Sequence, residues 1–472
     1  MKEKILQKQN ICIIGAGLSG LAAGLLLIKK GYKVTLFEKT NNPGGRASSF
    51  TPSNLGLSEY LSILSNFQIT IPFSEPKLET IYEKNMLKGY KLDTGFHLIG
   101  GGQRFVANGA FADIKNDLSF IGSRTGFVSK QGYRYSFFSS FEKIKLIPRI
   151  LQLFVSYRES RLIDLYDVPI VESLEQFNNK KLKQALALFS RGIATHNDLS
   201  LISTGETIRA LPKLLRGTQS LGYPRGGLKR LSDAYANFII NNRGNINYNS
   251  NVENIVIQKG NIRGIVTNGE EKKFDIVISS IPVQQIFSIV NESSFPSEYV
   301  KQLKRLIPSA GLCAYYCLKK INNPKLLGKT FMFLQENLDL KGKAGFGLID
   351  FKTACPDSGL APKNRYIVQA YIICTPDETQ NKKLIKQLKN VLDSLMRILI
   401  LDFDKQLLWA IYPVTKQLEG VAKIITNKRP SITTPINNFY LIGDCVKSSD
   451  FGINSCVNTA KKVEEIISKK ER

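Results

Sequence analysis

Residues 11–38 constrain the fold of this chain more than any other stretch. They begin with the apolar run ICII, continue through the turn GAGLSG and an Ala- and Leu-rich stretch, and end with the apolar run VTLF and Glu38. This pattern predicts a buried strand, a helix and a second buried strand, as in a βαβ unit. Three glycines at this spacing, after a strand and about 20 residues ahead of an acid, are typical of a dinucleotide site.

Each glycine of the turn has a separate physical role. Gly15 permits the tight turn from strand to helix, Gly17 leaves room for a pyrophosphate, and Gly20 lets the helix pack closely on the strand. The N–H groups at the start of the helix face the phosphates, and Glu38 accepts hydrogen bonds from ribose hydroxyls. The predicted binding residues of the turn are Gly15, Ala16, Gly17, Leu18, Ser19 and Gly20.

The residues after Glu38 narrow the type of cofactor. The sequence EKTNNPGGRASS at residues 38–49 resembles the second glycine motif of the FAD-dependent amine oxidase and phytoene desaturase-like superfamily. The resemblance implies that FAD is the cofactor. It implies that the backbone at Gly45 approaches the FAD phosphates and that Arg46 adds a fixed positive charge there. Lys39 belongs to the same implied binding set.

Two later stretches carry the same resemblance. The sequence GYPRGGLKRL at residues 222–231 matches an element where the chain of these proteins re-enters the nucleotide domain. Near the C-terminus, the apolar run FYLI is followed by Gly443 and Asp444 and then by an expected helix. By the resemblance, Asp444 binds a ribityl or phosphate-linked hydroxyl, and the start of the helix faces the flavin ring. The binding residues implied here are Val252, Gly443, Asp444, Gly452 and Ile453.

The fold class expected from these motifs is α/β. A Rossmann-type FAD-binding domain is combined with a discontinuous α+β substrate domain. The predicted FAD-binding domain comprises residues 1–90, 219–290 and 409–472. The predicted substrate domain comprises residues 91–218 and 291–408 and includes a helical lid or membrane-facing part.

The resemblance also implies a function. Within the superfamily, the chain looks most like phytoene desaturases and related carotenoid or prenyl-lipid enzymes. Amine oxidases usually place a Tyr or Trp shortly after the final Gly-Asp, whereas this chain has Phe451. We therefore expect an FAD-dependent oxidoreductase that moves hydride between flavin N5 and a long apolar isoprenoid- or carotenoid-type substrate, as a desaturase, saturase or isomerase. Two alternatives stay open: an amine or protoporphyrinogen oxidase, and a non-enzymatic prenyl-binding chaperone of the same fold, as in Rab GDP-dissociation inhibitors.

No catalytic side chain is assigned, because the flavin itself carries the chemistry in such enzymes. His97, one of only 2 histidines, is a candidate acid, base or positioning group beside the flavin, with a structural role as the alternative. His196 is expected to cap a helix. The 7 cysteines are scattered without a metal-ligand spacing, so no metal is expected.

The net charge of +26 indicates an anionic partner or only a Lys-rich composition. No zinc-finger or RNA-binding motif accompanies the charge, so a nucleic acid partner is not expected. Residues 141–158 interleave basic and apolar residues. This segment predicts either an amphipathic helix that lies on an anionic membrane or a core-facing helix. Reduced thiols predict a cytoplasmic location, with peripheral membrane contact through this segment.

Overall fold

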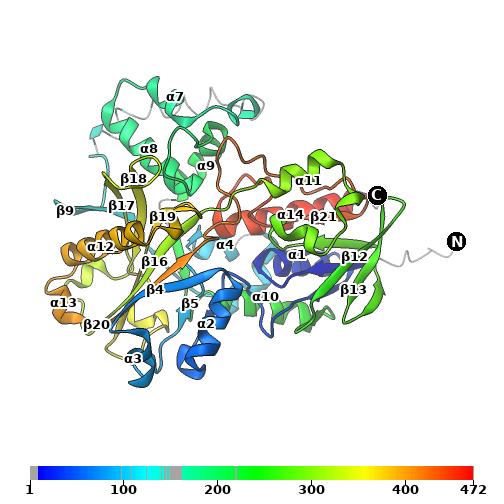
Figure 1. The fold of residues 1–472 in the computed structure, drawn as a ribbon, viewed down its shortest axis with the longest axis horizontal. Helices are drawn as coiled ribbons and strands as arrows, with labels where there is room; N and C mark the ends of the chain where they lie inside the picture. Colours follow the sequence, from blue (N-terminus) through cyan, green and yellow to red (C-terminus); the bar gives the residue numbers. More distant parts are fainter. Residues whose placement is uncertain are drawn as a thin grey trace.

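A computed structural model describes most of the chain. The described residues are 9–96, 98–107, 109–123, 125–139, 141–142, 145, 148, 162–217 and 221–470. Figure 1 shows two lobes: one holds the first strand and the last helix of the chain, and the other holds a large twisted sheet.

The first lobe is built on a parallel sheet. Its strand order is β11–β2–β1–β15–β21, and every neighbouring pair is parallel. Helices cover both faces of such a sheet, which explains why its strands are continuously apolar. Helix α1 (Leu18–Lys29) packs against α10 (Lys229–Asn241) and α14 (Gly452–Lys470). The strands are β1 (Asn10–Ile14), β2 (Lys33–Phe37), β11 (Asn245–Asn247), β15 (Ile276–Ser279) and β21 (Phe439–Leu441). The predicted strand–helix–strand unit is confirmed.

An antiparallel sheet of three strands accompanies the parallel one. Strand β12 (Val252–Gln258) pairs with β13 (Asn261–Thr267), and β13 pairs with β14 (Glu270–Lys273). The hairpin turns at Lys259 and Gly260, both of which have a positive φ. The residues that lead into β12 lie beside the end of β2, because Ser250 donates its N–H to the carbonyl oxygen of Glu38 at 2.8 Å.

The second lobe is built on a mixed sheet of eight strands. Its order is β4–β20–β16–β19–β18–β17–β8–β9, and all neighbours are antiparallel except β17 and β8. Helix α12 (Lys382–Leu399) packs its apolar side on one face, and alternate side chains of the strands, such as Cys313, Tyr315 and Tyr371, are buried on the other. The strands are β4 (Ile69–Glu75), β8 (Thr125–Ser129), β9 (Gly132–Arg134), β16 (Ala310–Leu318), β17 (Thr330–Glu336), β18 (Ala344–Asp350), β19 (Tyr366–Cys374) and β20 (Leu407–Thr415).

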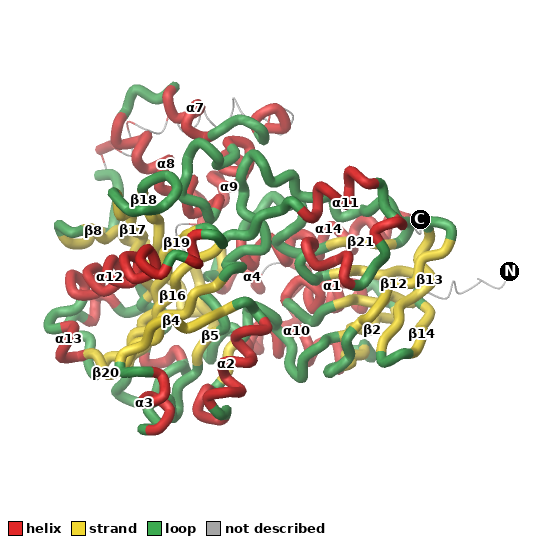
Figure 2. Tube along the Cα trace, viewed as in Figure 1, coloured by secondary structure: helices red, strands yellow, loops and turns green. Residues whose placement is uncertain are grey.

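Smaller elements connect and cover the two lobes. Figure 2 shows helices gathered around the edges of the large sheet and long loops between the lobes. The remaining strands are β3 (Ser49–Phe50), β5 (Leu92–Asp93), β6 (Ile99–Gly100), β7 (Phe120–Ser123) and β10 (Leu221–Pro224). The remaining helices are α2 (Leu57–Asn66), α3 (Leu78–Glu83), α4 (Gln103–Ala107), α7 (Ile170–Glu175), α8 (Lys180–Ala194), α9 (Thr204–Gly217), α11 (Ser297–Lys304) and α13 (Phe403–Gln406).

One buried carboxylate links strands of different sheets. Asp93 at the end of β5 accepts hydrogen bonds from Ser49 Oγ at 2.5 Å, Tyr223 Oη at 2.6 Å and Gln369 Nε2 at 2.9 Å. The hydroxyl of Tyr315 donates to the Asp93 carbonyl oxygen at 2.5 Å. Burial raises the pKa of the Asp93 carboxyl above its ordinary value, although these donors oppose the rise.

The pairing of two strands bears on the predicted division into domains. Strands β4 and β20 lie largely within segments assigned to the FAD-binding domain, yet both pair within the eight-stranded sheet. The division into domains by residue range therefore stays a proposal.

Two further predictions concern residues outside the described part. His97 and most of the segment 141–158 are not among the described residues. Within the described part, no helix combines the length and the apolar character needed to cross a membrane.

Candidate cofactor and substrate site

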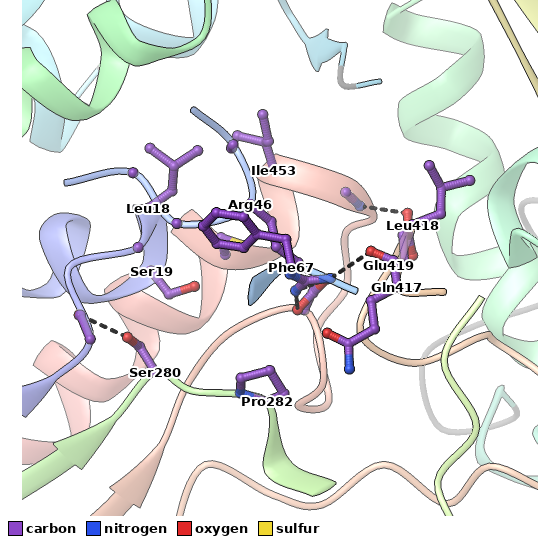
Figure 3. Close-up of a pocket in the computed structure, with 18 of the residues that line it drawn as sticks. Leu18, Ser19, Arg46, Phe67, Ser280, Pro282, Gln417, Leu418, Glu419 and Ile453 are labelled. Atoms are coloured by element: carbon purple, nitrogen blue, oxygen red, sulfur yellow. Dashed lines mark hydrogen bonds and ion pairs between the residues drawn. The ribbon is translucent and has the colours of Figure 1, made fainter. Parts of the chain in front are cut away.

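A cavity of about 390 Å³ is lined by residues of both lobes. Its walls come from the ends of β1 and β2, the loop after β2, the start of α14 and the large sheet. Figure 3 shows residues from these separate segments facing a common space, with Leu18 and Ser19 on one side and Leu418 and Glu419 on the other. The cavity has a polar half at the nucleotide motifs and an apolar half at the large sheet.

The glycine turn forms the floor of the polar half. Gly15 donates its N–H to the carbonyl oxygen of Phe37 at 2.8 Å, and Gly44 donates to that of Ala16 at 2.8 Å. A Cβ on Gly20 would lie 2.1 Å from the carbonyl oxygen of Gly15, so a side chain is excluded there. A Cβ on Gly17 would meet no protein atom within 4 Å, because it would point into the cavity.

Glu38 lies at the end of β2, where its carboxylate is buried. Oε2 accepts the N–H of Ala16 at 2.8 Å, and Oε1 accepts the N–H and hydroxyl of Thr40 at 2.9 and 2.8 Å. These donors fix the carboxylate beside the glycine turn. Glu38 also lines the cavity, so its oxygens lie where a ribose next to the pyrophosphate would be bound.

Arg46 and Asp444 form an ion pair in the cavity wall. Arg46 Nη2 lies 2.8 and 2.9 Å from the two Asp444 oxygens. Burial alone would lower the pKa of the Arg46 guanidinium, but the Asp444 carboxylate raises it above its ordinary value. Burial opposes ionisation of Asp444, yet Arg46 and the Gly420 N–H hold the pKa of that carboxyl below its ordinary value. Both groups are therefore charged at neutral pH.

Most of the predicted cofactor residues lie in the wall of this one cavity. Ala16, Gly20 and Gly443 lie behind it: Ala16 holds Glu38, and Gly443 donates its N–H to Thr459 Oγ1 at 3.0 Å. The predicted residues that line the cavity are Gly15, Gly17, Leu18, Ser19, Glu38, Lys39, Gly45, Arg46, Val252, Asp444, Gly452 and Ile453.

The arrangement fits a dinucleotide that spans the polar half. The open space at Gly17, the N–H groups of the first turn of α1 and the carboxylate of Glu38 meet the needs of a pyrophosphate and a ribose. The parallel contact between Gly17 and Gly44 brings the second glycine motif to the same point. Gly45 and Arg46 thus lie beside the glycine turn, although they are far from it in sequence.

The apolar half is formed by the second lobe. Phe96 and Tyr371 lie with ring centroids 4.5 Å apart and share a buried cluster with Leu418. Apolar side chains of this kind bind an apolar ligand and exclude water. The residues of this half are Phe96, Leu98, Phe189, Ile193, Leu221, Met332, Phe346, Leu348, Tyr371 and Leu418.

Several wall residues were not predicted from the sequence. Asn66 is the last residue of α2 and Phe67 follows it, within residues 55–87, for which the sequence predicts no role. Gln417 to Glu419 follow β20. Lys416 donates its N–H to the carbonyl oxygen of Gln68 at 3.2 Å, which brings these two segments together. No motif marks either segment, so only the pairing of β4 with β20 reveals their place.

Other candidates for chemistry lie apart from the cavity. His196 follows α8, and its Nδ1 accepts the N–H of Asp198 at 3.2 Å. Burial lowers the pKa of His196, so the neutral form is favoured and the residue is structural. Among the described residues, no group of three or more His, Cys, Asp or Glu side chains could hold a metal ion.

Comparisons with known proteins show which family and fold this chain resembles. A model of flavin-containing amine oxidoreductases matches residues 18–463. The chain is 25% identical over 512 positions to a 1-hydroxycarotenoid 3,4-desaturase of Flavobacterium sp. (strain P99-3), covering 96% of this chain and 98% of that protein. It is 27% identical over 290 positions to a 4,4'-diapophytoene desaturase of Methylomonas sp., covering 57% and 53%. An oxidoreductase from Methanosarcina mazei shares the fold, with a TM-score of 0.68, 19% identity, and 97% and 100% coverage.

Proposed function

The chain belongs to the flavin-containing amine oxidoreductases and is an FAD-dependent oxidoreductase, and we propose that it acts on a long apolar molecule of the isoprenoid or carotenoid type. FAD supplies the redox chemistry, because N5 of its ring accepts or donates a hydride. The residues of the chain bind the cofactor, orient the substrate and exclude water.

The proposed cofactor contacts follow from the polar half of the cavity. Glu38 binds the ribose of the adenosine half, and the N–H groups of the first turn of α1 bind the pyrophosphate. Val252 lies at the adenine end through the backbone of β12. Arg46 and Asp444 bind on the opposite side, where their charges meet the phosphates and the ribityl hydroxyls.

The apolar half of the cavity is the observation that carries the substrate proposal. It continues from the wall at Gln417 to Glu419 into a space enclosed by aromatic and aliphatic side chains. The three carboxylates in the described walls, Glu38, Glu419 and Asp444, already have partners among N–H groups or cations. A cationic amine would find no free carboxylate there, whereas a hydrocarbon chain loses no hydrogen bond on entering.

The named relatives support removal of hydrogen as the direction of the reaction. The relatives from Flavobacterium and Methylomonas are both carotenoid desaturases, and the one from Flavobacterium aligns with nearly the whole chain. We propose that a carbon–carbon single bond of the substrate becomes a double bond by loss of a hydride and a proton, both of which bound FAD would accept to become FADH2. The apolar walls hold the reacting carbons and keep water away from them.

The test is a comparison of substrate classes under anaerobic conditions. Purified FAD-loaded protein is mixed with acyclic carotenoids in micelles, with polyamines and with porphyrinogens, and the flavin absorbance is followed. Bleaching by carotenoids, with a product that contains additional double bonds, is the expected result. Bleaching by amines or porphyrinogens alone would replace this proposal with an oxidase of the corresponding class.

A further inference from the structure

A second ion pair lies beside Arg46 and Asp444. Lys423 Nζ lies 2.6 Å from Glu419 Oε2, and the two side chains are only 2% and 11% exposed. Glu419 lines the cavity, as Figure 3 shows. Lys423 is not among the lining residues. The function proposed above assigns no role to either residue.

The backbone holds both residues in place. Glu419 donates its N–H to Ser309 Oγ at 2.8 Å and accepts the Ser309 N–H at 3.1 Å. Lys423 donates its N–H to the carbonyl oxygen of Ala194 at 3.0 Å, at the end of α8. Burying two charges is costly, and such a pair is often no more stabilising than apolar side chains of similar volume. Stability alone therefore does not account for it.

The pair lies at the boundary between the two halves of the cavity. Arg46 Nη1 donates to the carbonyl oxygen of Gln417 at 3.3 Å, on the polar side. Leu418, the next residue, packs with Phe96 and Tyr371 on the apolar side. Glu419 thus belongs to the short segment that separates the nucleotide from the apolar space, which is where a flavin ring meets its substrate.

Glu419 also contacts the last helix. Its Oε1 accepts the N–H of Gly452 at 3.1 Å, at the first residue of α14. The first turn of α14 contains no acidic residue of its own, so Glu419 supplies a negative charge to this positive helix end. Lys423 in turn neutralises Glu419 and contributes to the low pKa of Asp444.

We propose that Lys423 and Glu419 are positioning residues that set the charge beside the flavin ring and thereby its reduction potential. The two ion pairs together comprise two cations, Arg46 and Lys423, and two anions, Glu419 and Asp444, so the formal charge of this cluster is zero. Reduction places additional electrons on the ring. Loss of the lysine leaves one net negative charge in a poorly solvated wall and disfavours the reduced cofactor. Loss of the carboxylate has the opposite effect.

The inference rests on FAD occupying the cavity, as proposed above, but it is independent of the identity of the substrate. The reduction potential of the bound FAD can be measured even if the protein oxidises no carotenoid. A failure of the substrate proposal and a failure of this one are therefore distinguishable.

The test is the midpoint potential of the bound flavin, measured by anaerobic dye-linked titration. Lys423→Met should shift the equilibrium between oxidised and reduced flavin at least tenfold toward the oxidised form, about 30 mV for a two-electron couple. Glu419→Gln should shift it in the opposite direction. The double variant Lys423→Met with Glu419→Gln should return close to the wild-type potential, and Lys423→Arg should retain it.

A matched control is available on α12. Lys389 and Asp393 form another buried lysine–carboxylate pair four residues apart, with side chains 12% and 7% exposed, and they do not line the cavity. Lys389→Met should leave the potential unchanged. If Lys423→Met shifts the potential no more than Lys389→Met, or if both single variants shift it in the same direction, the proposal is wrong. If Lys423→Met does not fold, Glu419→Gln alone decides, and an unchanged potential rejects the proposal.

Discussion

Gly17 is the residue where a side chain would enter the cavity without disturbing the protein. Its backbone angles, φ −70° and ψ 172°, are extended and accessible to any residue. Gly17→Val should therefore fold, yet its isopropyl group would occupy the space of the pyrophosphate. We expect a loss of FAD affinity of at least roughly 100-fold, or about 2.7 kcal/mol. Flavin content after purification and fluorescence titration with FAD measure the effect.

Gly56 provides the control for this variant. It also precedes a helix, has an extended backbone, and would place a Cβ in open space, but it does not line the cavity. Gly56→Val should keep full flavin content. Equal flavin content in the two variants would mean that the pyrophosphate does not pass Gly17.

Glu38 permits a more graded prediction. Its carboxylate accepts two ribose hydroxyls in the proposed complex, so Glu38→Ala should weaken FAD binding by about 1–3 kcal/mol. This corresponds to roughly a 5- to 150-fold higher Kd. Glu38→Gln keeps one acceptor oxygen, so its Kd for FAD should lie between those of Glu38→Ala and the wild type. A Kd unchanged in Glu38→Ala would remove this residue from the ribose site.

At the scale of residues, the predicted cofactor residues come from local motifs, whereas other residues of the cavity wall belong to none. Gly17, Glu38 and Arg46 belong to local motifs whose spacing is set by a turn, so a short stretch suffices to identify them. Phe67 and Glu419 belong to no motif. They reach the cavity because β4 pairs with β20, a contact between distant parts of the chain that no local pattern encodes.

At the scale of secondary-structure elements, β5 ends in a residue that is hydrogen-bonded to three other strands. Asp93 binds side chains from β3, β10 and β19 at once, so Asp93→Asn replaces an acceptor with a donor that faces other donors. We expect a loss of about 1–3 kcal/mol in the free energy of unfolding, measured with urea. Asp404→Asn, at an exposed ion pair, is the control and should change little.

The effect of this variant should depend on pH. Burial raises the pKa of Asp93 above its ordinary 3.8. Between 3.8 and the raised value, the folded chain keeps a proton that the unfolded chain has lost, so the free energy of unfolding falls as pH rises through this window. The asparagine variant lacks this titration. The difference in the free energy of unfolding between Asp93→Asn and the wild type should therefore shrink as pH rises. A difference that stays constant with pH would contradict the raised pKa of Asp93.

Apolar patterning accounts for many of the elements of the second lobe but not for all of them. Strands β16 and β19 and helix α12 follow directly from apolar runs and helical spacing. Strand β18 does not follow from local propensity, because its sequence AGFGLID contains two glycines, which normally weaken a strand. The structure explains Gly347: a Cβ there would lie 2.2 Å from the ring of Phe333 on the neighbouring strand. Close packing between strands thus overrides local propensity.

At the scale of the whole molecule, the charge of +26 still calls for a test. We predict that the protein binds anionic vesicles through the basic segment 141–158 and that added salt weakens this binding. Each basic residue near such a surface contributes about 1 kcal/mol. Reversal of Lys143, Lys145 and Arg149 to Glu should abolish sedimentation with the vesicles and leave flavin content intact.

The matched control reverses three exposed lysines on α12: Lys382, Lys383 and Lys386. This control changes the net charge by the same amount. A difference in vesicle binding between the two triple variants is therefore due to the segment 141–158 and not to the total charge. If both variants bind the vesicles equally, the overall charge of the protein causes the binding. The segment 141–158 would then be a core-facing helix.

The order of the parallel sheet has a consequence for biosynthesis. Strand β1 is central and is made first, whereas Asp444 and Gly452, which complete the wall of the cofactor site, follow it late in the chain. Gly452 comes 442 positions after Asn10, and a ribosome adding 5–20 residues per second needs roughly 20–90 s to reach it. Throughout that interval the nascent chain presents a glycine turn with no opposite wall. We therefore expect flavin capture to occur late in synthesis, and a chain that terminates before the last strand should not retain its cofactor.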